Sequence, residues 1–154
     1  MAKKIAIRTW THEDLADVLR LGRLMHEESA YQRMTWDEPT AKAYIFNCFW
    51  DPLTTCFIAE DEDEQVVGLL GVVLTSMYFS TDIVVKDILF YVHPEFRGSS
   101  AALRMIKAAE EWGVLYGAAE AQLGVSGEID TERTVCFFKR LGYNDCAVQL
   151  RKGL

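Results

Sequence analysis

The segment Val84–Trp112, VVKDILFYVHPEFRGSSAALRMIKAAEEW, contains a predicted strand, a loop of small residues and a predicted helix. Its first part belongs to an apolar run over residues 83–92, interrupted only by Lys86 and Asp87. A run of this kind is typical of a strand that is buried on both faces. The strand is expected to end at His93-Pro94, because proline cannot donate to a sheet and pushes its predecessor into an extended conformation.

The predicted strand leads into a loop of small residues, 97–102, and then into an amphipathic helix. The apolar positions of that helix recur at helical spacing: Ala102, Met105, Ile106, Ala109, Trp112 and Tyr116. A helix N-terminus without bulky side chains presents free backbone N–H groups and a positive dipole end, and so suits a phosphate or pyrophosphate. Arg97 adds a fork-shaped cation beside this site.

The stretch Tyr91–Ala102, YVHPEFRGSSAA, resembles the acetyl-CoA signature of the GCN5-related N-acetyltransferases, the GNAT superfamily. In that family a strand ending in a Val-x-Pro-like run is followed by Arg/Gln-x-x-Gly-x-Gly/Ala and a helix. The match is good through Arg97-Gly98, whereas Ser100 and Ala102 stand where the family often has glycines. The resemblance in the order of elements covers residues 5 to 151.

The resemblance implies that acetyl-CoA is the acyl-donor co-substrate. The backbone of Tyr91 and Val92 would pair with the pantetheine arm and polarise the thioester. The loop that would wrap the pyrophosphate consists of Arg97, Gly98, Ser99, Ser100, Ala101 and Ala102. The segment 131–143, which ends in Leu-Gly-Tyr, matches the family's second cofactor contact and implies contacts from Thr131 and Phe138.

The leaving thiolate has no matching general acid in this sequence. Phe138 stands where the family often has a tyrosine, and it has no hydroxyl. A thiol of this kind can leave as the thiolate, so the substitution is compatible with turnover. Tyr91, Tyr143 or a water molecule are the alternative acids.

The incoming ammonium must lose a proton before it attacks, which requires a base or a water relay. Asp87 is the leading candidate, because burial in a strand would raise its pKa toward a useful range. The competing interpretation is a salt bridge between Asp87 and Arg8 or Lys86. The further candidate bases are His93, Glu120 and Glu128.

The segment 26–36 is predicted to be a loop between the first two helices and to bind the acceptor. It carries Glu28, Tyr31 and Trp36, and acids together with aromatic rings suit an amine. An exposed polar loop without a binding role is the alternative. No metal is expected, because the cysteines and histidines lack metal-ligand spacing.

The whole chain predicts an α/β (α+β) fold. Strands are expected at residues 5–8, 55–60, 65–77, 83–92, 120–125 and 144–151, with helices beginning near Thr11, Asp37, Ala102 and Thr131. This order predicts a GNAT-like, mixed and mostly antiparallel central sheet of six to seven strands, flanked by about four helices and containing one parallel right-handed crossover. Residues 1–154 are expected to form a single domain.

The composition restricts partners and location. The formal net charge is −7 and the isoelectric point about 5.0, which argues against a nucleic-acid partner. No apolar run reaches the roughly 18 residues typical of a membrane span, and the apolar run Ile5–Ile7 is too short for a signal-peptide core. A cytoplasmic protein is therefore expected. The apolar final strand could pair with a second copy, so a homodimer is possible but not required.

The function expected from these patterns is N-acetyltransferase activity. The acetyl group of acetyl-CoA would pass to a primary amine of a small molecule or protein by direct attack in a ternary complex. A non-catalytic, regulatory CoA-binding module of the same fold is the first alternative. An unrelated phosphate-binding α/β domain is disfavoured, because neither G-x-x-x-x-G-K-[ST] nor a spaced G-x-G-x-x-G occurs.

Overall fold

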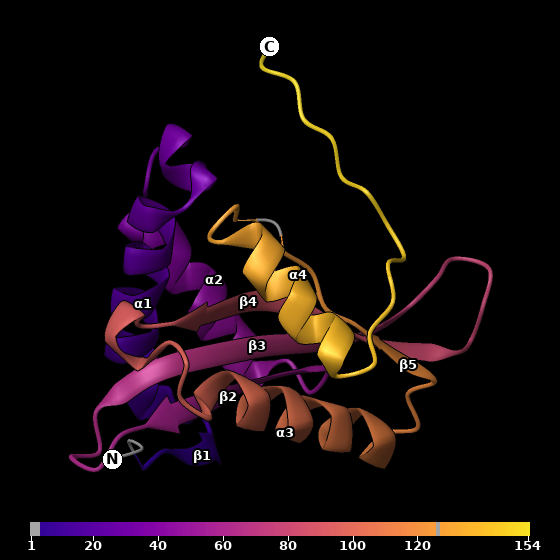
Figure 1. Ribbon diagram of the computed structural model, residues 1–154, viewed down its shortest axis with the longest axis horizontal. Coiled ribbons are helices and arrows are strands. Elements are labelled where there is room, and N and C mark those ends of the chain that lie inside the picture. The colour runs from indigo at the N-terminus through magenta and orange to yellow at the C-terminus, as the bar shows by residue number, and fades with distance from the viewer. Residues whose placement is uncertain (1–3, 126) are drawn as a thin grey trace.

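A twisted sheet forms the centre of the protein, and helices lie on both of its faces (Figure 1). The computed structural model describes residues 4–125 and 127–154. The strands lie in the order β1-β2-β3-β4-β5. Strands β1 to β4 pair antiparallel, whereas β4 and β5 are parallel. Their bounds are β1 Ala6–Thr9, β2 Thr54–Glu60, β3 Val66–Ser76, β4 Ile83–Val92 and β5 Glu120–Gln122.

The described residues contain four α-helices and three short 3₁₀ turns. The α-helices are α1 Leu15–Glu28, α2 Glu38–Trp50, α3 Ala101–Leu115 and α4 Thr131–Arg140. The 3₁₀ turns are η1 His12–Asp14, η2 Ala30–Arg33 and η3 Pro94–Phe96. In this part of the chain no helix is long and apolar enough to cross a membrane.

Each face of the sheet has its own hydrophobic core. Helix α3 packs on one face, where Met105 and Ile106 are fully buried against strand residues such as Leu70. Helix α1 packs on the other face, where Leu21 is fully buried with Ile58 and its neighbours. The two cores follow from the alternation of side chains along the strands, since successive residues point to opposite faces.

The structure confirms the predicted mixed sheet, its mainly antiparallel pairing, its parallel crossover through α3 and its four helices. Strand β4 has the bounds that the apolar run predicted. The number of strands was wrong, because the sheet has five rather than six to seven.

The missing strand is the one predicted at residues 144–151, which form no strand here and extend away from the sheet (Figure 1). Its alternating apolar residues give it strand propensity, but a strand also needs a partner edge. The neighbouring edge, β5, is only three residues long. Val148 and Leu150 are consequently 87% and 89% exposed, and pairing with a second copy stays a prediction.

The predicted loop at residues 26–36 is partly helical. Helix α1 continues through Glu28, and a 3₁₀ turn follows it. The polar residues lack an apolar period, but an i,i+4 ion pair between Arg23 and Glu27, 3.0 Å apart, supports the last turns of α1. The Ser29 hydroxyl then accepts the N–H of Tyr31 and begins the 3₁₀ turn.

Candidate active site

Strands β4 and β5 separate soon after they meet. They pair only at Val84–Lys86 with Glu120–Gln122. Within the described residues no strand covers this edge of β4 from Asp87 onward, so backbone N–H and C=O groups there are open to a ligand. A groove of about 510 Å³ lies at the opening and reaches the loop at residues 97–99 and helix α4. We call it the β4 groove.

A bulge in β4 lies where the strands diverge. Gly71 of β3 faces Leu89 and Val72 faces Asp87, so Ile88 is the extra residue. A bulge interrupts the alternation of side chains and bends the strand. Ile88 and Leu89 accordingly both line the β4 groove and also line a second cavity, described below.

Asp87 spans the gap between the two strands. Its Oδ1 accepts the backbone N–H of Gly124 at 2.7 Å, and burial raises the pKa of its carboxyl. The predicted salt bridge with Arg8 is not formed, because Arg8 pairs with Asp14 and Glu60, each at 2.7 Å. Asp87 lines the β4 groove, whereas three other candidate bases do not line it: His93, Glu120 and Glu128. The role of Asp87 as a base stays a prediction.

The loop after β4 approaches the groove through small residues. Gly98 has a φ of +86°, a left-handed conformation that favours glycine. Arg97, Gly98, Ser99 and Ala102 line the groove. The first N–H groups of α3 have no intrahelical acceptor, so this end of the helix can receive an anion. Ser100 and Ala101 do not line the groove, and Ala101 is fully buried in the core under α3.

Three predicted site residues meet at the end of β4. The Arg97 guanidinium donates to both carboxylate oxygens of Glu28, with the Nη2–Oε2 distance at 2.6 Å. The Tyr91 hydroxyl donates to Glu28 Oε2 at 2.7 Å, and Arg97 Nε donates to the carbonyl of Val92 at 3.0 Å. This Glu28–Tyr91–Arg97 cluster therefore ties the C-terminal end of α1 to β4 and to the loop at residues 97–99, which we call the anion-binding loop after its expected role.

The cluster fixes the protonation of its members. The guanidinium of Arg97 holds the pKa of the Glu28 carboxyl below its usual range. Burial, together with the hydrogen bond to Glu28, raises the pKa of Tyr91 to about 12. Tyr91 is therefore a phenol at neutral pH and can donate a proton, but it cannot accept one. Glu28 and Arg97 have partners within the protein, although sequence reasoning assigned them to the acceptor and to the pyrophosphate.

Replacing Glu28 with glutamine is expected to lower the free energy of unfolding at pH 7 by about 1–3 kcal/mol, because hydrogen bonds to charged groups are lost. The folded-state pKa of Glu28 is lowered, so its contribution is present above the unfolded value of 4.5 and is lost as the pH falls below it. Urea unfolding at several pH values measures the difference. A difference that stayed constant from pH 7 to pH 3 would contradict this account. Glu27→Gln is the matched control, because its exposed ion pair with Arg23 contributes only about 0.3–0.5 kcal/mol.

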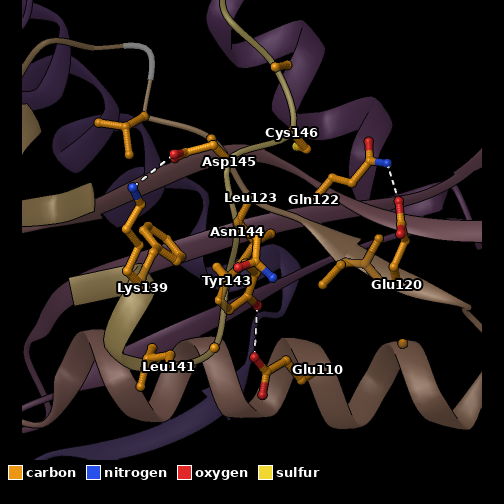
Figure 2. A pocket seen from close by; sticks show the side chains of 18 of the residues that line it. Glu110, Glu120, Gln122, Leu123, Lys139, Leu141, Tyr143, Asn144, Asp145 and Cys146 are labelled. Atoms are coloured by element: carbon orange, nitrogen blue, oxygen red, sulfur yellow. Dashed lines mark hydrogen bonds and ion pairs between the residues drawn. The ribbon is translucent and has the colours of Figure 1, made fainter. Parts of the chain in front are cut away.

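Helix α4 lines the β4 groove with residues other than the two expected to contact the cofactor. Arg133, Thr134 and Phe137 line the β4 groove. Thr131 and Phe138 line a separate cavity of about 660 Å³ beside β5 and the C-terminal segment, part of which is shown in Figure 2. Their contact with a cofactor stays a prediction. The spacing 133, 134, 137 marks one helical face, which is the signal that could have identified these residues.

Tyr143, another candidate general acid, lines the cavity beside β5. The Tyr143 hydroxyl donates to Glu110 Oε1 at 2.8 Å, and Lys139 donates to Asp145 at 2.9 Å (Figure 2). Burial and this hydrogen bond raise the pKa of Tyr143. Phe138 is 5% exposed and packs against Tyr143 and Phe90 as a core aromatic. Tyr143 therefore lies away from the groove.

A second cavity, of about 460 Å³, lies between α1, α2 and the sheet. We call it the α1–α2 cavity. Tyr31 and Trp36, two of the predicted acceptor-binding residues, line it. It shares walls with the β4 groove at four residues: Met25, Tyr31, Ile88 and Leu89. The two spaces are therefore neighbours beside the bulge. Among residues 4–125 and 127–154, no group of three His, Cys, Asp or Glu side chains is placed to hold a metal.

Comparison with known proteins identifies the fold and the family. No curated protein matches the sequence. A transcriptional regulator from Bacillus halodurans C-125 has the same fold, with a TM-score of 0.79, 18% identity and coverage of 98% of this chain and 100% of that chain. The aminoglycoside 6′-N-acetyltransferase AAC(6′)-Ih from Acinetobacter baumannii gives a TM-score of 0.76, 17% identity and coverage of 98% and 99%.

A third structure of this fold is AAC(6′)-Iy in complex with the bisubstrate analogue CoA-S-monomethyl-acetylneamine. It gives a TM-score of 0.76 at 19% identity, covering 98% of this chain and 99% of that chain. The acetyltransferase (GNAT) family model matches residues 21–143, a span that contains the β4 groove and most of the α1–α2 cavity. The chain belongs to the acetyltransferase (GNAT) family.

Proposed function

We propose that this protein is an N-acetyltransferase that transfers the acetyl group of acetyl-CoA to a primary amine by direct attack in a ternary complex. The observation that carries the proposal is the opening between β4 and β5, which meets both the anion-binding loop and the α1–α2 cavity. The same fold in a complex of AAC(6′)-Iy with a CoA-containing bisubstrate analogue supports it.

The donor would lie along the β4 groove. The pantetheine arm is extended and carries amides, so it can pair with the open edge of β4 at Tyr91 and Val92, as an added strand does. The pyrophosphate would reach the N–H groups at Gly98 and the start of α3. The thioester would then lie near the bulge, where backbone N–H groups can polarise its carbonyl oxygen.

The reaction needs two proton movements. Asp87, with its raised pKa, is the carboxylate proposed to take the proton from the ammonium, directly or through water. The amine nitrogen forms a bond to the thioester carbon and the C–S bond breaks. The thiolate leaves and takes a proton from water or from Tyr91. Water is the better donor, because a pKa of about 12 makes Tyr91 a weaker acid than a thiol, and its proton is already donated to Glu28.

Thiol release with acetyl-CoA and a mixture of primary amines tests the proposal. Direct transfer predicts amine-dependent release of CoA, intersecting double-reciprocal plots, and an unchanged protein mass after incubation with acetyl-CoA alone. Release that is independent of amine would contradict acetyl transfer. A protein mass increased by one acetyl group, together with parallel plots, would contradict direct attack.

Arg133, which the sequence analysis did not name as a site residue, gives the next test. One Nη of Arg133 lies 3.9 Å from where a Cβ on Gly98 would be, so this exposed arginine stands beside the loop proposed for the pyrophosphate. Arg133→Gln is expected to weaken acetyl-CoA binding about tenfold, because a hydrogen bond to a charged group is lost. Calorimetry at two salt concentrations should also show a smaller salt dependence. Arg140→Gln, on the same helix but outside the groove, should bind as the native chain does; equal effects of the two changes would refute the assignment.

One observation favours a second candidate function, a non-catalytic CoA-binding module. The family's tyrosine position holds Phe138, and this side chain is buried in the core. Such a module would bind acetyl-CoA and release no CoA with any amine, so the thiol-release assay also separates these two functions.

A further inference from the structure

The walls of the α1–α2 cavity indicate what kind of amine would fit there. Aromatic side chains enter from four segments of the chain: Trp10, Tyr31, Trp36 and Tyr44. Aliphatic side chains on α1 and β4 complete the walls, and Gly22 and Gly71 leave room between them. A volume of about 460 Å³ accommodates a small organic molecule rather than a protein chain.

The charge of the cavity is as informative as its shape. Among the described residues that line it, Asp37 is the one carboxylate, and this side chain is exposed and already accepts the N–H of Thr40 at 2.9 Å. A polyamine would need several carboxylates, because an unpaired ammonium against apolar walls is costly. An aromatic wall favours a ligand with one cationic group on an apolar body.

Two polar atoms in the same walls have no partner. The ring nitrogens Nδ1 of His26 and Nε1 of Trp36 are buried without a hydrogen bond in the described part of the chain. His26 Nε2 lies 2.7 Å from the carbonyl of Met34 and must donate to it, which leaves Nδ1 as an acceptor. Both nitrogens are closed to solvent, so a ligand in the cavity would reach them only if the His26 and Trp36 rings turned.

The cavity lies next to the proposed site of chemistry. Met25, Tyr31, Ile88 and Leu89 form walls of both the cavity and the β4 groove. An occupant of the cavity can therefore direct one end toward the bulge, where the proposed thioester would lie. The adjacency of the two spaces argues that the cavity holds the acceptor rather than an unrelated ligand.

We propose that the acceptor is a small amine with a single cationic nitrogen on an aromatic or similarly apolar body, bound in the α1–α2 cavity. This inference rests on the proposed function, because only an acetyltransferase has an acceptor. The binding of such an amine can nevertheless be measured without turnover. It distinguishes this protein from the aminoglycoside acetyltransferases that share its fold, since an aminoglycoside carries several ammonium groups on a polar body.

The test is calorimetry of 2-phenylethylamine and of neamine, an aminoglycoside, against the native chain saturated with CoA. We expect 2-phenylethylamine to bind at least about tenfold more tightly, a difference of about 1.4 kcal/mol. In Gly22→Leu the added side chain begins 3.7 Å from the Trp36 ring and extends into the cavity. It should weaken the binding of 2-phenylethylamine about tenfold or more and leave acetyl-CoA binding unchanged. Gly22→Ala is the matched control for the backbone.

A second variant covers the case in which Gly22→Leu does not fold. Tyr44 is 55% exposed, so Tyr44→Ala leaves the core intact while removing one aromatic wall, and it should weaken binding about fivefold. Neamine binding as tightly as 2-phenylethylamine, or 2-phenylethylamine failing to bind, would overturn the inference, as would binding that neither variant weakens. Binding without amine-dependent CoA release would support the cavity as a site for such an amine and overturn the proposed catalytic function.

Discussion

Acetyl-CoA is expected to bind at least about 100-fold more weakly when Gly98 is replaced by tryptophan, the equivalent of two lost hydrogen bonds to a charged phosphate. Gly98 lines the β4 groove and has a φ of +86°, so its backbone approaches a ligand without a side chain in the way. An indole at this position would enter the space between the loop and Arg133. Calorimetric titration of acetyl-CoA measures the loss.

Gly117 provides a matched control for Gly98→Trp. It has a similar φ of +75°, and a Cβ there would meet no atom within 4 Å. Gly117→Trp should therefore suffer a comparable cost in backbone strain, on the order of 1–2 kcal/mol, yet bind acetyl-CoA as the native chain does. Equal binding by the native chain and Gly98→Trp would show that the phosphates lie elsewhere.

Replacing Gly113 with alanine is expected to destabilise the fold by about 2 kcal/mol, which is a typical cost of overpacking a core. Gly113 lies on the buried face of α3, and a Cβ there would be 2.5 Å from Cγ2 of Val85. Val85 is 1% exposed in β4, which is paired on both edges at this point, and its β-branched side chain is stiff. Helix α3 must therefore move away from the sheet. Urea unfolding measures the loss.

The clash can be tested by removing its other partner. Val85→Ala alone should cost about 2 kcal/mol through the cavity it leaves, but in that background Gly113→Ala should cost less than half as much as in the native chain. Val114→Ala, on the exposed side of the same helix, should change stability by no more than about 0.5 kcal/mol. Additive effects of the two core changes would contradict the packing described here.

The structure of Val84–Trp112 could be predicted from its sequence, because several local sequence signals agreed. The apolar run, the proline after it and the small-residue loop mark β4 and the start of α3, and the structure places both elements there. The strand predicted at residues 144–151 was wrong. Alternating apolar residues indicate strand propensity, but a strand forms only if distant residues supply a sheet edge to pair with. The length of β5 could not be deduced from residues 144–151 themselves.

The candidate site was predicted in part, for related reasons. Strand and loop residues that line the β4 groove were identified, since their positions follow from a local motif. The partners of Glu28 and Arg97 were not, because 69 positions separate them in sequence and only the packing of α1 beside β4 brings them together. Thr131 and Phe138 were selected by aligning a short helix on its ending, which does not fix the face of α4 that lines the groove.

The most direct test of the central claim is calorimetric titration of acetyl-CoA into the native chain. We expect one acetyl-CoA site per chain from the β4 groove, the anion-binding loop and the family membership. CoA should compete with acetyl-CoA for this site, and nucleoside triphosphates should compete only weakly. An absence of binding heat at several temperatures, or equal competition by nucleoside triphosphates, would contradict the assignment of the groove to acetyl-CoA.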